Sequence, residues 1–268
     1  MKRFLILLAV MAPALSIRAE DPPQKINLDR IPAAIVDTVI VPVPTEIFGV
    51  LDKLGSPNWH EVLRKTDASP HGERAQVALL LGSVIAEGFI AVEAQESEEV
   101  KKIGRSVLKL SGAMSVQQSV KARSNAIIEA AGKKDWETVK KELDGAQQDV
   151  KQAMLELNDE QLAQLVSLGG WLRGTEALTT VVLKNYTKDG AELLNQPALL
   201  EYFIRRIDGM DGKLKNHPLV AKISLMLPQI RPLISEPDGD ISKAEVEKVG
   251  QIVADLVKTI TSTEQQEQ

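Results

Sequence analysis

The feature that most limits the fold of this chain is residues 76–94, QVALLLGSVIAEGFIAVEA, which are apolar on every side of a helix. A helix that is apolar all round is buried, either in a protein core or in a membrane. This stretch contains Glu87 and falls short of the roughly 20 apolar residues that a bilayer-spanning helix needs. We therefore predict a central helix over about residues 70–95, in the core of a soluble, all-α domain.

A second apolar stretch, at about residues 159–185, is predicted to pack against the first. Small residues recur in both stretches, and in the first their spacing is four. They are Ala78, Gly82 and Ala86 in the first stretch and Gly169, Gly170 and Gly174 in the second. Glycine inside a helix costs about 1 kcal/mol relative to alanine, so several in two apolar helices indicate that the two backbones approach closely. The alternative is that these residues only accommodate bulky neighbours.

Apolar periodicity along the rest of the chain predicts roughly nine or ten helices and no convincing sheet. Residues 98–110 and 136–157 each show a narrow apolar seam with dense charge around it. Such amphipathic helices pack on the body of a domain, and their exposed faces are candidates for a protein partner or for self-association. We assign residues 45–262 to a single helical domain, or to two helical halves packed closely together.

The start of the chain has the pattern of a secretory signal peptide, residues 1–19. Lys2 and Arg3 precede an apolar run, and Ala19 is a small residue suited to cleavage. The chain has no cysteine, so we expect neither disulfides nor a lipid anchor on cysteine. These features predict a periplasmic or secreted protein whose stability comes from its core alone.

The acidic balance of charge argues against two classes of partner. Removal of residues 1–19 takes three basic residues and no acidic ones from a chain of net charge −5, which leaves −8. Sequence-independent binding of nucleic acid needs a basic surface, and so does docking on anionic lipid. We expect no nucleic-acid partner and no membrane span, although an acidic surface also serves simply to keep a protein soluble.

The two ends of the domain carry weaker patterns. Residues 20–44 are expected to form an extended or flexible leader. Within it, residues 31–44 either lie extended on the helical body or form a short helix over residues 33–39. The polar residues 263–268 are expected to form a disordered tail.

Glu87 is the most informative single residue. Its helical neighbours three and four positions away carry no charge, so its carboxylate is predicted to be buried. A buried carboxylate is costly unless it is paired or protonated. The second apolar helix supplies Arg173 and Glu176, with Thr180 near the same side. We predict that these four residues form a buried polar cluster in which Glu87 and Arg173 make a salt bridge.

No motif in the chain specifies a reaction. The three histidines, His60, His71 and His217, lack the spacing of helical metal ligands. Residues 237–245 resemble part of a calcium-binding EF-hand loop but lack a glycine of that loop, and a turn followed by a capping box explains them as well. The chain contains neither a nucleophile elbow nor a phosphate loop. We therefore assign no catalytic residue, no metal and no cofactor.

Two functions are compatible with these patterns. The first is a non-catalytic binding or scaffolding module of the bacterial envelope, in which the Glu87 cluster fixes helix register. The second is a helical enzyme or small-ligand carrier with a polar site between the two apolar helices, where Trp171 and Tyr186 would line the cavity. A pocket of several hundred Å³ at that junction favours the second function, and tight packing there favours the first.

Overall fold

The computed structural model describes residues 33–36, 39–42, 57–64, 68–234 and 240–262, with only the backbone described at residues 33–36 and 39–42. The chain divides into two units, Met1–Ile31 and Pro32–Gln268, and every described residue belongs to the second. The predicted signal peptide, most of the predicted leader and the predicted tail lie outside the described residues.

The described residues form an all-α fold, as predicted. The long helices are α2 (Arg74–Glu93), α3 (Ser97–Ala113), α4 (Gln117–Lys133), α5 (Trp136–Glu156), α6 (Glu160–Lys184), α8 (Pro197–Asp208), α10 (Pro218–Met226) and α12 (Lys243–Thr261). The short ones are η2 (Trp59–Glu61), α7 (Lys188–Glu192), α9 (Gly212–Lys215), η3 (Leu227–Gln229) and α11 (Arg231–Ile234). The two predicted apolar helices correspond to α2 and α6.

A small hairpin is the part of the fold that the apolar periodicity did not predict. Strands β1 (Ala33–Val36) and β2 (Val39–Pro42) pair antiparallel, with Ala33 opposite Pro42 and Val36 opposite Val39. The backbone here is extended, so of the two conformations considered for this segment the short helix is wrong. The β-branched residues of this stretch favour strand over helix.

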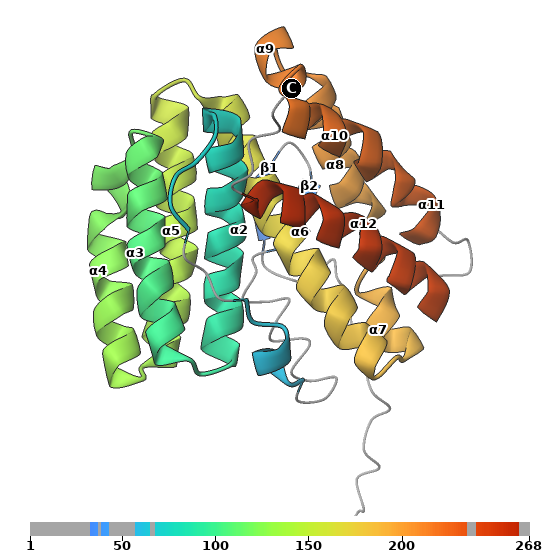
Figure 1. Cartoon of the computed structure of the whole chain (residues 1–268), viewed down its shortest axis with the longest axis horizontal. Helices are drawn as coiled ribbons and strands as arrows, with labels where there is room; N and C mark the ends of the chain where they lie inside the picture. The colour runs from blue at the N-terminus through green and yellow to red at the C-terminus, as the bar shows by residue number, and fades with distance from the viewer. Residues whose placement is uncertain (1–32, 37–38, 43–56, 65–67, 235–239, 263–268) are drawn as a thin grey trace, which may run out of the picture. The chain divides into compact units, whose positions relative to one another are not determined.

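The helices are arranged around the pair α2 and α6. Figure 1 shows α2, α3, α4 and α5 side by side, with α6 running obliquely past α2 and with α8, α10, α11 and α12 on the other side of α6. Each of α2 to α5 packs on its neighbour in sequence, α5 also packs on α2 and α6, and α12 packs along α6. Contacts along their length show that α2 and α6 run in the same direction, since Leu79 meets Gly169 and Glu87 meets Arg173.

Glycines allow the closest approach between α2 and α6. A Cβ placed on Gly82 would lie well inside 3.0 Å of the Val166 carbonyl oxygen, and a Cβ on Gly169 would overlap the Leu79 carbonyl oxygen in the same way. Gly170 lies beside Gly82 at ordinary contact distance, whereas a Cβ on Gly174 would meet nothing within 4 Å. The prediction of close backbone contact is therefore confirmed for Gly82, Gly169 and Gly170 and is wrong for Gly174.

The turns that connect α2 to α6 all follow one design. One or two positions after each helix end, a residue other than glycine has positive φ. These residues are Gln95 (φ 56°), Ser115 (φ 64°), Lys134 (φ 56°) and Asn158 (φ 57°). In each turn the next backbone N–H donates to a carbonyl five residues back, as from Asp135 to Ala130, which is the bond that defines a Schellman motif. Four turns of the same kind make successive helices antiparallel neighbours.

Helix α2 is also the one described helix that is long and apolar enough to cross a membrane. In its most apolar window of 18 residues, 94% of the residues are buried inside the fold. It is a core helix, and no membrane span is evident in the part of the chain that the structure describes.

Candidate functional site: a buried carboxylate and arginine cluster

The Glu87 carboxylate lies in the interior, between α2 and α6. Its side chain is only 4% exposed, and the Nε of Arg173 donates to its Oε2 over 2.5 Å. The Arg173 side chain is itself 2% exposed. The predicted contact between these two residues is therefore present, and it joins the two apolar helices 86 residues apart in sequence.

Glu176 supplies a second carboxylate to the same place. It stands three residues after Arg173 on α6, so both side chains leave the same face of the helix. The Nη1 of Arg173 lies 3.4 Å from Glu176 Oε2, and the Glu176 side chain is 7% exposed. One guanidinium thus contacts two buried carboxylates.

A third segment closes the cluster, and sequence analysis did not anticipate it. Residues 57–64, here called the strap, contain η2 and lie across the pair α2 and α6. The backbone N–H of Arg64 donates to Glu87 Oε1 over 2.6 Å, and its Nη2 donates to Glu176 Oε1. The Nη2 of Arg173 donates to the Val62 carbonyl oxygen over 2.7 Å. All four carboxylate oxygens of Glu87 and Glu176 therefore accept a hydrogen bond.

Other contacts hold the strap at its edges. Trp59 and Val62 are buried, Lys184 of α6 makes an ion pair with Glu61, and His60 lies 3.2 Å from Glu96. The apolar anchors and the charged contacts together fix the strap over the cluster.

The electrostatics of the cluster are dominated by burial. Burial raises the pKa of the Glu176 carboxyl above its ordinary value of 4.5, and the neighbouring Glu87 carboxylate raises it further. The guanidinium groups of Arg173 and Arg64 act in the opposite direction and lower this pKa. The pKa remains raised because the loss of hydration destabilises the charged carboxylate more than the two arginines stabilise it.

Thr180 does not join the carboxylates as predicted. Its hydroxyl donates to the backbone carbonyl oxygen of Glu176 over 2.8 Å, one turn earlier in α6, and the hydroxyl of Thr179 does the same over 2.9 Å. A threonine inside a helix commonly satisfies its hydroxyl in this way. The cluster therefore consists of Glu87, Arg173, Glu176 and Arg64.

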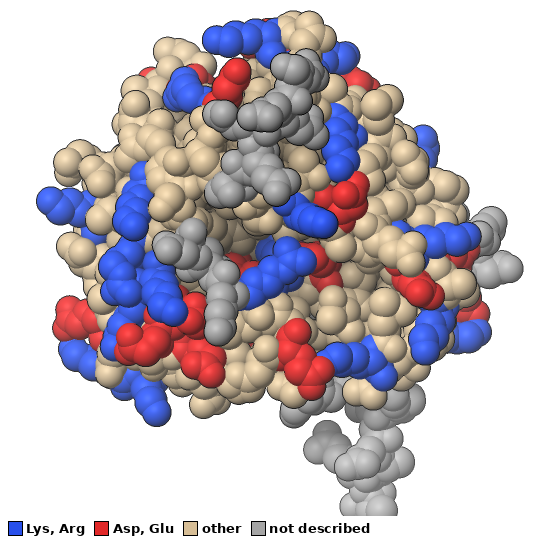
Figure 2. All heavy atoms as spheres, viewed as in Figure 1, with Lys and Arg blue, Asp and Glu red and all other residues tan. Residues whose placement is uncertain are grey.

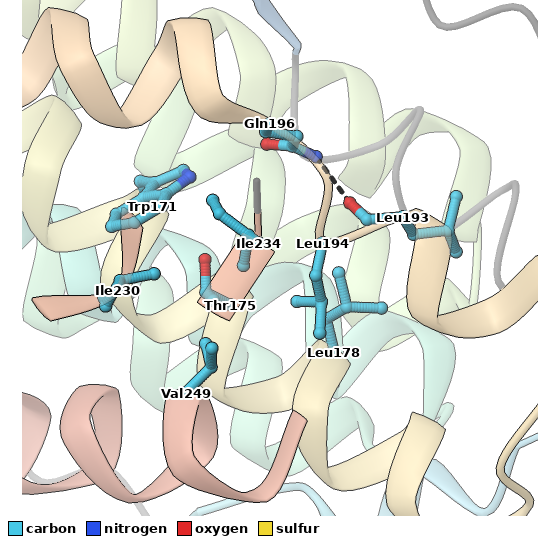
Figure 3. Close-up of a pocket in the computed structure, with 9 residues that line it drawn as sticks. All are labelled: Trp171, Thr175, Leu178, Leu193, Leu194, Gln196, Ile230, Ile234 and Val249. Carbon is cyan, nitrogen blue, oxygen red and sulfur yellow. Dashed lines mark hydrogen bonds between the residues drawn. The ribbon is translucent and has the colours of Figure 1, made fainter. Parts of the chain in front are cut away.

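The two aromatic residues predicted to line a cavity lie elsewhere. Trp171 borders a small hollow on another face of α6, as Figure 3 shows, together with residues of the 193–196 turn, of α11 and α12, and Ile230 between η3 and α11. The hollow is mostly apolar and holds no more than about one water molecule. Tyr186 is not among its lining residues, and its hydroxyl donates to the Ile241 carbonyl oxygen over 2.8 Å. Neither aromatic ring faces the cluster.

Arg64 is the cluster residue that sequence analysis missed. Two buried carboxylates against the single base Arg173 indicate that a second cation is needed. The sequence did not identify it, because Arg64 and Glu176 are 112 residues apart. No periodicity links a residue in a short turn to a helix so distant in the chain.

The described part of the chain offers little else of a chemical kind. It contains no group of three or more His, Asp or Glu side chains positioned to hold a metal ion. His217 caps α10, because its Nδ1 accepts from the Leu219 N–H over 3.3 Å. Ser242 and Glu245 form the capping box predicted at the start of α12. On the face shown in Figure 2, basic and acidic side chains lie beside one another.

Comparison with known proteins gives no relative from which a role could be transferred. No protein-family model, no curated protein and no solved structure matches this chain.

Proposed function

We propose that this chain is an exported, non-catalytic binding or scaffolding protein of a bacterial envelope. The observation that carries the proposal is the closed state of the cluster, in which each oxygen of Glu87 and Glu176 accepts a hydrogen bond from Arg173 or Arg64. A general acid or base needs an oxygen that a substrate can reach. Here the protein's own groups engage all four oxygens.

The packing at the helix junction supports the same proposal. A small-ligand site usually occupies 300–1,000 Å³, whereas Gly82 and Gly169 bring the backbones of α2 and α6 into direct contact. The alternative of an enzyme or carrier with its site between these helices gains no support from this geometry. A rigid helical body whose surface carries mixed charges suits contact with another macromolecule.

Export is part of the proposal and rests on the signal-peptide pattern of residues 1–19. The chain is to be expressed in a Gram-negative host and the cell fractions analysed by intact mass. We expect a periplasmic product that begins at Glu20. Leu7→Arg, which interrupts the apolar run, is the matched control and should leave the full chain in the cytoplasm. An uncleaved wild-type chain in the cytoplasm would refute export.

The binding role is tested on protein purified from its native envelope. Cross-linking before lysis should join the chain to one or a few defined partner proteins, and native mass spectrometry should give the mass of the polypeptide alone. A small molecule that copurifies in stoichiometric amount, and is lost from a folded Glu87→Gln variant, would establish the carrier alternative instead.

A further inference from the structure

Arg64 and Arg173 share the two buried carboxylates between them. The Arg173 guanidinium donates to Oε2 of both Glu87 and Glu176. The Arg64 guanidinium donates to Glu176 Oε1, whereas the bond to Glu87 Oε1 comes from the Arg64 backbone N–H. The helix pair by itself therefore presents two carboxylates and one guanidinium, a net charge of −1. The strap brings the compensating positive charge.

The place that the Arg64 guanidinium occupies is reached from the surface. The Arg64 side chain is 42% exposed, although the Glu176 carboxylate that it contacts is 7% exposed. The side chain thus extends inward from solvent to a buried anion. This is how an arginine from another chain would also enter, and the planar guanidinium suits carboxylate oxygens better than a compact ammonium does.

We propose that the Arg64 guanidinium is an internal ligand of the buried Glu176 carboxylate, which forms a guanidinium-binding cradle of net charge −1 with Glu87 and Arg173 beside it, and that an arginine on a peptide segment of a partner protein takes its place when the strap is displaced. This inference deepens the proposed binding function and rests on it. The strap then acts as an autoinhibitory segment, because the cradle is filled until a competing arginine arrives.

The cradle is tested by chemical rescue of the full-length Arg64→Ala variant. Ethylguanidinium at millimolar concentration should raise the Tm of this variant by at least about 2 °C. Ethylammonium, which has the charge without the planar fork, should have a clearly smaller effect. Arg105→Ala, at an exposed arginine on α3 outside the cluster, is the matched control and should show no rescue. If Arg64→Ala does not fold, the same test is applied to Arg64→Gln, whose side chain is longer than that of alanine and polar.

Displacement is tested with a capped peptide that copies residues 57–64, PNWHEVLR, and with the same peptide in which the arginine is alanine. The arginine peptide should bind Arg64→Ala at least tenfold more tightly than it binds the wild type, and the alanine peptide should lose that preference. A folded variant that ethylguanidinium stabilises no more than Arg105→Ala overturns the cradle. A rescued variant that binds both peptides equally overturns displacement. Neither result depends on the native partner, so a wild-type chain that cross-links to nothing refutes the binding function separately.

Discussion

Replacement of Gly82 by alanine is the sharpest test of how this fold is held together. Gly82 stands where α2 crosses α6, and the added Cβ would lie far inside 3.0 Å of the Val166 carbonyl oxygen and 2.8 Å from the Gly170 amide nitrogen. Both obstacles are backbone atoms of a helix, so neither can rotate away as a flexible side chain would. The two helices must therefore separate or bend.

The cost follows from the packing around that point. Restoring ordinary van der Waals distances requires a separation of roughly 1 Å or more, and such a gap removes a quarter to a half of the dispersion energy of each contact across it. Overpacking in a core costs about 1–3 kcal/mol and occasionally more. Alanine recovers about 1 kcal/mol of helix propensity over glycine. We place the overpacking cost at the upper end of that range, about 3 kcal/mol, because α2 and α6 form the centre on which the other helices pack, and we therefore expect a net loss of about 2 kcal/mol.

The matched control is Gly174→Ala on α6, where the added Cβ would meet nothing within 4 Å. Only helix propensity acts there, so this variant should gain about 0.5–1 kcal/mol. Urea unfolding followed by far-UV circular dichroism gives both free energies, with the slope m reporting any change in compactness. If Gly82→Ala proved as stable as Gly174→Ala, the close contact between the two backbones would be refuted.

Three further substitutions test the cluster and the turns. Glu87→Gln should lower the free energy of unfolding by about 3 kcal/mol, because it leaves a buried guanidinium only partly compensated, and unchanged stability in urea would contradict this role. The raised pKa of Glu176 means that the folded state binds a proton at higher pH than the unfolded state does. Wild type should therefore gain stability relative to Glu176→Gln as the pH falls from neutral toward 4.5. A stability difference between the two proteins that stays constant with pH in urea titrations would contradict the raised pKa. Lys134→Gly should raise Tm with a gain of about 0.5 kcal/mol, since a left-handed conformation costs a side-chain-bearing residue about 1–2 kcal/mol and the freedom of glycine returns part of that. A fall in Tm would show that the Lys134 conformation is not strained.

Much of the cluster could be predicted because it depends on local patterns. Glu87 interrupts an all-apolar helix, and Arg173 and Glu176 share one face of the other apolar helix, so their meeting follows once the two helices pack. Thr180 was misplaced because its hydroxyl finds a carbonyl one turn away in its own helix. Tyr186 was misplaced because its hydroxyl bonds to a backbone atom 55 residues further along the chain.

The turns illustrate a second limit of local patterns. Sequence signals for helix ends emphasise glycine, yet the turns from α2 to α6 place glutamine, serine, lysine and asparagine in the left-handed conformation. These residues tolerate that conformation at a cost that the packing of successive helices outweighs. No local property of Gln95 or Lys134 reveals that these residues adopt the left-handed conformation. The energy that offsets its cost comes from contacts between the two helices that each turn joins.

The amino-acid sequence by itself determined that the chain is helical, which two helices lie at its centre and that an acid and a base meet between them. These properties follow from apolar periodicity and from the cost of burying an isolated charge. Both can be recognised from residues that are close together in the sequence. The tertiary structure alone decided which glycines touch a facing backbone and that the strap completes the cluster with Arg64. Both depend on groups far apart in the chain, whose distance is fixed only when all the helices have packed.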